Sequence, residues 1–155
     1  MPSASRSTTP VGIDLDIVEG RYAELGDYTV AFETFKTDLD VTPYFHGLPG
    51  DVCSCEHLGY VTAGQITFRW PDHEETYVEG DAYVAGPGHS PLIAAGTSTV
   101  EFSRTADLQA VMEVIGRNIE ATREAYGLTD TQVEYMDNWG GNTSNTDVAK
   151  DEATI

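Results

Sequence analysis

Short β-prone runs separated by turn residues restrict the fold of this chain more than any other feature of its sequence. Between residues 57 and 103 these runs read "HLGYVTAG", "QITFRW", "TYVEGDAYVAG", "SPLIAAG" and "STVEFS". Gly, Pro and Asp interrupt them at short intervals, so each strand is expected to be short and to end in a turn. Many short strands in succession are typical of an antiparallel sandwich or barrel.

An earlier segment, residues 28–33, alternates in polarity with a period of two. Tyr28, Val30 and Phe32 share one face of an extended chain, and the residues between them share the other. Because successive side chains of a strand point to opposite sides, this pattern predicts a half-buried strand.

A helix is predicted after the last β-prone run, from Thr105 to about Tyr126, with Gly127 at its end. Apolar residues recur along it at helical spacing: Leu108, Val111, Met112, Ile115 and Ile119. Such a stripe usually faces a core, so we expect it to pack on the barrel or on a partner subunit.

The charge of the chain excludes some classes of partner. With 26 acidic against 8 basic residues, the formal net charge is -18. Nucleic acids and anionic membranes attract cationic surfaces, so neither is an expected partner. No run approaches the roughly 18 to 20 apolar residues of a membrane helix. We therefore expect a soluble, cytoplasmic protein.

The stretch "CSCEHLGYVTAG", residues 53–64, contains both cysteines of the chain and one histidine. If it is extended, Cys53, Cys55 and His57 point to one side, since side chains alternate across a strand. Thiolate and imidazole suit zinc, copper or iron. Three other interpretations stay open: a loop that scatters these side chains, buried cysteines that act as small core residues, and a redox pair of the two thiols.

A second stretch, "GDAYVAGPGHSP" at residues 80–91, supplies another histidine. Gly86-Pro87-Gly88 bends the chain just before His89, and such a bend can direct His89 inward. His89 would then be a ligand from a different strand.

Together these two stretches resemble the two sequence motifs of the cupin superfamily, in particular those of small single-domain bacterial cupins. The resemblance covers about residues 43–119. It implies an all-β fold, a double-stranded β-helix (a jelly-roll barrel) with a C-terminal α-helix here, frequently dimeric. It also implies a divalent metal held inside by two His and a Glu from the first motif and a His from the second.

This chain departs from that ligand pattern. Where cupins usually place the first-motif Glu it has His57, and the two usual His positions fall near Asp51 and Cys53. The usual second-motif His falls at Pro91. Thus His57 and His89 are the first candidate ligands, Cys55 and Cys53 the next, and Asp51 or Glu56 the last.

The chain is divided here into three parts. Residues 1–20 are expected to form a flexible arm, residues 21–127 the cupin barrel with its helix, and residues 128–155 an acidic, partly disordered tail. Val11 to Tyr28 is the interval in which order should begin.

These observations lead to one hypothesis and one alternative. The first is a metal-binding cupin that holds or transforms a small molecule in the barrel, with zinc, iron or copper as the metal and a homodimer as the assembly. The second is a non-catalytic small-ligand binding or sensor module. Whether the protein is an enzyme stays open. Tyr60 and Tyr83 are candidates for a catalytic phenol, against ordinary aromatic packing in a sheet.

Overall fold

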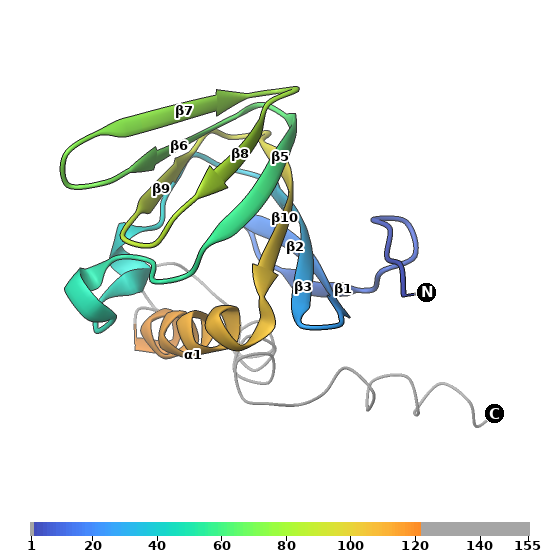
Figure 1. Ribbon diagram of the computed structural model, residues 1–155, viewed down its shortest axis with the longest axis horizontal. Coiled ribbons are helices and arrows are strands. Elements are labelled where there is room, and N and C mark those ends of the chain that lie inside the picture. The colour runs from blue at the N-terminus through green and yellow to red at the C-terminus, as the bar shows by residue number, and fades with distance from the viewer. Residues whose placement is uncertain (1, 122–155) are drawn as a thin grey trace.

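The computed structural model describes residues 2–121. This part of the chain consists of β-strands, two 3₁₀ helices and one α-helix (Figure 1). The strands are β1 (Val11–Asp14), β2 (Val18–Leu25), β3 (Tyr28–Phe35), β4 (Leu39–Asp40), β5 (His57–Ala63), β6 (Gln65–Arg69), β7 (Glu74–Val78), β8 (Ala82–Ala85), β9 (Ser90–Ile93) and β10 (Ser98–Arg104). The helices are η1 (Thr42–Phe45), η2 (Pro49–Asp51) and α1 (Thr105–Ala121).

The strands pair in a nested order. β3 pairs with β10, β4 with β9, β5 with β8 and β6 with β7, and every pair is antiparallel. A long antiparallel ribbon that folds over in this way is a jelly roll, the architecture of cupins. The predicted all-β jelly roll followed by a helix is confirmed.

The pairs form two sheets, which are not joined into one closed barrel by any strand pair within residues 2–121. One sheet has the order β1-β2-β3-β10-β5-β8 and the other the order β4-β9-β6-β7. In Figure 1 the two sheets face each other and α1 lies below them. Phe35, Val61, Ile66, Phe68 and Ile93 pack between the sheets. Ile66 and Phe68 alternate along β6, so both point to the same face of its sheet.

Residues 28–33 form part of strand β3, as predicted, but this strand is buried on both faces and not half-buried. Val30 is 1% exposed and Phe32 8%, yet Thr29 and Ala31 on the opposite face are 4% and 6% exposed. β2 and β10 cover the two edges of β3, and side chains on both of its faces are buried. Alternation correctly predicted which residues share a face, but the more polar face, with Glu33, is the one that lines the interior.

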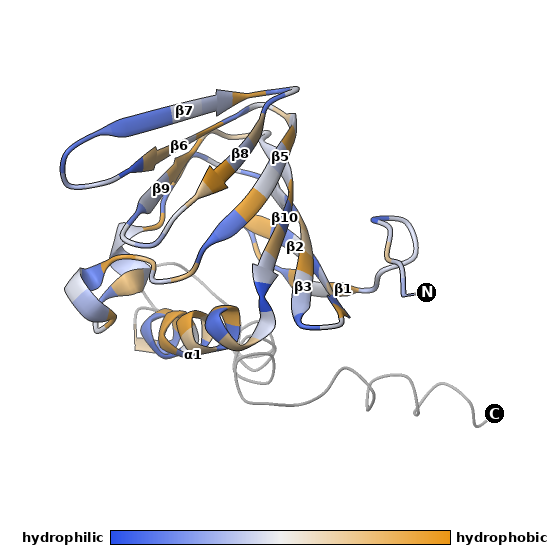
Figure 2. Ribbon diagram, in the orientation of Figure 1, coloured by the Kyte–Doolittle hydropathy of each residue, from blue (hydrophilic) through white to orange (hydrophobic). Residues whose placement is uncertain are grey.

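Helix α1 uses its apolar stripe against its own domain. Leu108, Val111 and Ile119 are buried, and the stripe packs against η1 and against residues from β1 and β3. Figure 2 shows apolar and polar residues alternating around this helix. No helix in the described part of the chain combines the length and apolarity needed to span a membrane. The rest of the predicted helix and the tail at 128–155 lie outside the described residues.

At the other end of the chain, two strands occupy part of the segment assigned to an arm. β1 and the start of β2 lie within residues 1–20 and pair with each other, and β2 pairs along the whole of β3. Arg6 also donates hydrogen bonds to Thr34 Oγ1 and to the carbonyl oxygen of Glu33, both 2.8 Å long. These contacts tie the first residues of the chain to the sheet.

Candidate metal centre

The two sequence motifs meet at a short backbone bridge. The amide of Cys53 donates to the carbonyl of His89 at 2.8 Å, and the amide of Gly88 donates to the carbonyl of Cys53 at 2.7 Å. Gly88 has a positive φ of 94°, a conformation open to glycine at little cost. The bend at residues 86–88 therefore holds His89 directly opposite Cys53.

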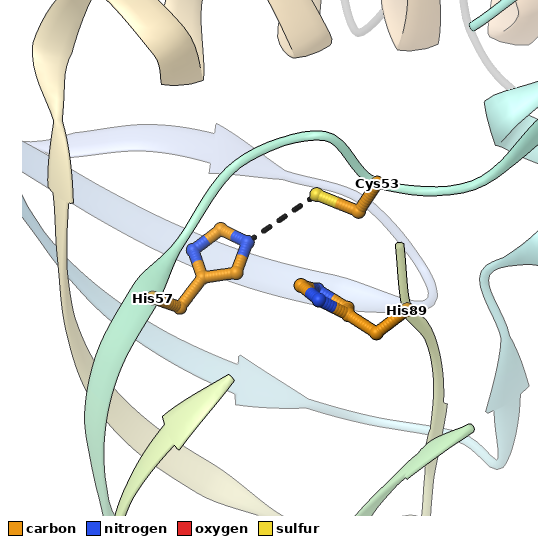
Figure 3. A group of neighbouring side chains, drawn as sticks. All are labelled: Cys53, His57 and His89. Atoms are coloured by element: carbon orange, nitrogen blue, oxygen red, sulfur yellow. Dashed lines mark hydrogen bonds between the residues drawn. The ribbon is translucent and has the colours of Figure 1, made fainter. Parts of the chain in front are cut away.

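Three side chains converge from these segments into one cluster, Cys53, His57 and His89 (Figure 3). Their ligand atoms all lie within 4.8 Å of one another, and all three residues are buried. Cys53 Sγ is 3.5 Å from His57 Nε2. The two imidazole rings lie 5.2 Å apart, centre to centre, at 66°.

In both histidines a hydrogen bond at Nδ1 orients the ring so that Nε2 is the atom that faces the cluster. His89 Nδ1 lies 2.6 Å from the carbonyl oxygen of Gly86, which can only accept, so this nitrogen carries the proton. His57 Nδ1 is bonded to Ser103 Oγ at 2.7 Å. Metal-binding histidines are commonly oriented by a hydrogen bond of this kind.

Burial determines the protonation of the cluster. It lowers the pKa of His57 and of His89 to about 4, so both imidazoles are neutral at neutral pH. Burial also raises the pKa of the Cys53 thiol to about 12. Without a cation this sulfur stays protonated, and binding of a metal would release its proton.

The cluster fits a divalent metal in both chemistry and spacing. Tetrahedral zinc with bonds of about 2.3 Å to sulfur and 2.0–2.1 Å to nitrogen separates a sulfur from a nitrogen ligand by about 3.5 Å. The separation of Cys53 Sγ from His57 Nε2 is 3.5 Å. One thiolate and two imidazoles form a donor set suited to zinc, iron or copper.

Cys55 lies outside this cluster, although the sequence placed it beside Cys53 and His57. The three residues do not share one strand, because β5 begins only at His57. Cys55 packs with Leu108 and Val111, and its Sγ faces the carbonyl oxygen of Glu56 at 3.5 Å. Both cysteines pack in the same apolar cluster, but only Cys53 Sγ also faces the imidazoles, which favours a core role for Cys55.

The remaining sequence candidates are spread over the molecule. Asp51 and Glu56 are exposed, so neither side chain joins the cluster. Tyr60 points outward from β5 and is 46% exposed. Tyr83 is buried, and its hydroxyl donates to the carboxylate of Glu101. Of the two candidate phenols, only Tyr83 reaches the interior.

A cavity of about 160 Å³ adjoins the cluster between the sheets and α1. Cys53, His57 and His89 contribute to its wall, while α1, β1 and β2 supply mainly apolar residues. Its other polar wall residues were missed from the sequence: Glu33, Thr99, Glu101 and Ser103. The last three alternate along "STVEFSR", a signal that they share a face, but alternation does not tell which face is inside.

Comparison with known proteins gives two kinds of result. No family model matches the chain. Over 44 residues, or 28% of its length, the chain is 61% identical to a UPF0182 protein of Corynebacterium efficiens and 57% identical to one of Corynebacterium diphtheriae. The chain spans about 4% of the length of those curated relatives.

Solved structures with a similar fold include cupin-type proteins. The KdgF structure from a Halomonas species has a TM-score of 0.48 and 17% identity, over 64% of this chain and 90% of that one. An RmlC-like cupin from Shewanella frigidimarina gives 0.46 and 12%, over 65% and 88%. The polyketide cyclase RemF from Streptomyces resistomycificus gives 0.49 and 15%, over 66% and 78%. The nested strand pairing shows a jelly roll, the fold that the resemblance of the two motifs to those of cupins implied.

Proposed function

We propose that this protein is a metal-binding cupin in which Cys53, His57 and His89 hold a divalent cation at the wall of a small-molecule cavity. The observation that carries the proposal is the cluster itself, because three buried soft donors from two separate motifs face the same space. A free buried cysteine and a buried histidine each occur commonly in cores. Here the two histidines and the cysteine come together, and each imidazole is oriented through Nδ1 as metal-binding histidines usually are.

A cation there would have three protein ligands and one position open to the cavity, as catalytic metal sites have. When bound, it would supply a Lewis acid or an oxygen-activating centre. The chain's own residues do the rest: Ser103 and the Gly86 carbonyl orient the imidazoles, and the apolar wall excludes water. Zinc, iron and copper all suit this donor set, and the reaction type is left open.

Elemental analysis of the purified protein tests the proposal directly. After expression with added zinc, iron(II) or copper, we expect close to one equivalent of one of these metals in the wild-type chain. Cys53→Ser and His57→Ala should lose it. Cys55→Ser is the matched control, because Cys55 is equally buried but lies outside the cluster. A wild-type protein with less than about 0.1 equivalent of every metal would refute the site, since ligand sets of this kind bind tightly.

The alternative function, a non-catalytic binding or sensor module, is favoured by one specific observation. Helix α1 lines the cavity through Met112, Ile115 and Ile119, so a bound ligand would contact the helix directly. Amide hydrogen exchange distinguishes the two functions. A sensor should show slower exchange across α1 on ligand binding and no turnover, whereas an enzyme should convert its ligand.

Homodimerisation follows from the cupin resemblance and is part of this proposal. Sedimentation velocity at micromolar concentration tests it, with a species of twice the monomer mass expected. A single monomeric species would refute the proposed dimer. It would leave the proposed metal site unaffected, because all three ligands come from one chain.

A further inference from the structure

A second group of polar side chains lines the cavity on the inner face of the larger sheet. β3 and β10 are adjacent there, with Glu33 directly opposite Thr99 and Ala31 opposite Glu101. Glu33 and Glu101 are therefore diagonal neighbours on one face, within reach of a common ligand. We call Glu33, Thr99 and Glu101 the oxygen cluster.

Each carboxylate of the oxygen cluster is held by a tyrosine. Tyr22 Oη donates to Glu33 Oε1 at 2.6 Å, and Tyr83 Oη donates to Glu101 Oε1. A Cβ atom at Gly59 would overlap the Tyr83 ring, so this glycine lets Tyr83 cross β5 from β8 to reach Glu101 on β10. The carboxylates are thus fixed in position by residues on three other strands.

The oxygen cluster has acceptors left over and lacks donors. A phenol has one O–H proton to donate. Tyr22 and Tyr83 each donate it to the Oε1 atom of a carboxylate, so the Oε2 atoms receive no hydrogen bond from the phenols. Thr99 is 1% exposed, and its hydroxyl has no hydrogen-bond partner within the described residues. Since buried polar groups nearly always have partners, this hydroxyl indicates a ligand in the cavity.

The charge of the cluster indicates the sign of that ligand. Burial raises the pKa of Glu33 to about 7, with the neighbouring Glu101 as the next cause. Arg6 is close enough to favour the Glu33 carboxylate, but its guanidinium binds the backbone and Thr34. A cationic donor between the two carboxylates would compensate for their burial.

The rest of the wall sets the shape of the ligand. Apart from Ser103, the two tyrosines Tyr22 and Tyr44 and the Cys53, His57 and His89 cluster, it is apolar, with Ile13, Leu15, Met112, Ile115 and Ile119 among the lining residues. The volume is about 160 Å³. An apolar cavity of about 150 Å³ holds a molecule the size of benzene. A ligand of this size has room for one polar group and a short hydrocarbon body.

We propose that the cavity binds a small primary ammonium compound with an apolar body, and that its three N–H groups bond to Glu33, Thr99 and Glu101. This inference rests on the proposed small-molecule cavity and names its ligand class. None of the three residues belongs to the Cys53, His57 and His89 cluster, but Glu101 Oε2 lies 3.8 Å from His57 Nδ1, so the inference is tested at Glu33 and Thr99.

Titration of the full chain with three probes of one shape tests this inference. n-Butylammonium, 1-butanol and butyrate share their hydrocarbon chain and differ in the head group. Two-dimensional amide NMR should show saturable shifts with the amine, at least about tenfold weaker binding of the alcohol, and none of the acid. Equal binding of amine and alcohol, or no binding of the amine, would overturn the inference.

Variants locate the binding. Glu33→Gln and Thr99→Val should each weaken amine binding about tenfold, since each removes one acceptor of a charged donor. Thr99→Val is nearly isosteric and removes a hydroxyl without a partner, so it should fold even if Glu33→Gln does not. Glu75→Gln is the matched control, because Glu75 accepts from Tyr77 at 2.5 Å in the same way but on the surface. Its amine affinity should match wild type.

The two proposals fail separately. Cys53→Ser should bind the amine as wild type does, even though it loses its metal. Loss of amine binding in Cys53→Ser, with none in Glu33→Gln or Thr99→Val, would assign the amine to the metal cluster and overturn the inference. A chain without metal that still binds the amine would refute only the metal site.

Discussion

The two polar groups in the cavity wall differ in almost every chemical respect. The cluster of Cys53, His57 and His89 provides sulfur and nitrogen ligand atoms and comes from the two sequence motifs. The oxygen cluster of Glu33, Thr99 and Glu101 lies on two central strands. Soft donors select transition metals, whereas carboxylates attract hard or organic cations. One small cavity thus presents two sites that can be tested independently.

The largest expected effect separates the two cysteines. Cys53→Ser should lower zinc affinity at least about a hundredfold, near 3 kcal/mol, while Cys55→Ser changes it by no more than about threefold. The reason is that only Cys53 shares the space of the imidazoles. Competition with a chromogenic chelator measures both. Similar losses in the two variants would mean that the sulfurs act together.

The next effect tests how the oxygen cluster is supported. Gly59→Ala should destabilise the protein by about 2–3 kcal/mol, because the new methyl group displaces the Tyr83 ring and leaves Glu101 without its donor. Urea unfolding gives the free energy. In a Tyr83→Ala background the same glycine substitution should cost much less. An equal cost in both backgrounds would show that the ring is not what Gly59 accommodates.

The third effect concerns pH and belongs to Glu33. The pKa of Glu33 is raised from 4.5 to about 7 in the folded protein. Between these pH values the folded protein therefore still holds a proton on Glu33 that the unfolded chain has already released. Stability should therefore fall as pH rises from about 4.5 to 7, by roughly 2–3 kcal/mol. Glu33→Gln removes this dependence, so its stability relative to wild type should be about 3 kcal/mol greater at pH 8 than at pH 4.5.

Thermal and urea unfolding at both pH values measure this difference. The other groups that act on Glu33 are Tyr22, Glu101 and Arg6, and all remain in the variant. A difference between Glu33→Gln and wild type that is the same at both pH values would show that the Glu33 carboxyl titrates normally.

The smallest effect concerns the support of His57. Ser103→Ala removes the hydroxyl bonded to His57 Nδ1 and should weaken zinc binding about tenfold, in the range found for residues that orient metal ligands. Ser98→Ala is the control on the same strand, because Ser98 Oγ pairs with Thr34 Oγ1 at 2.9 Å instead. A chelator competition that finds the two variants alike would remove Ser103 from the site.

Much of the fold could be predicted, because strand length and turn chemistry are local properties. The short runs from residue 57 to residue 103 became strands, and the stripe from Leu108 to Ile119 became the inner face of α1. β1 and β2 were missed although each pairs with its neighbour along the chain, because their inner residues Ile13 and Tyr22 are buried by packing with Ile119 of α1, which is distant in sequence. The direction of the Cys55 side chain was also not predicted, because the chain before His57 is not a regular strand and its side chains do not alternate.

The sequence by itself determined an antiparallel sandwich or barrel and the helix after it, because these follow from periodicity and turns. The jelly roll was implied by the resemblance of two motifs, which contain Cys53, His57 and His89, to those of cupins. Only the tertiary structure decided that Cys53 and His57 meet His89 without Cys55, and that Glu33 and Glu101 face the interior. Periodicity establishes which side chains share a face. Which face is buried depends on the opposite sheet and on α1, which pack against it from elsewhere in the chain.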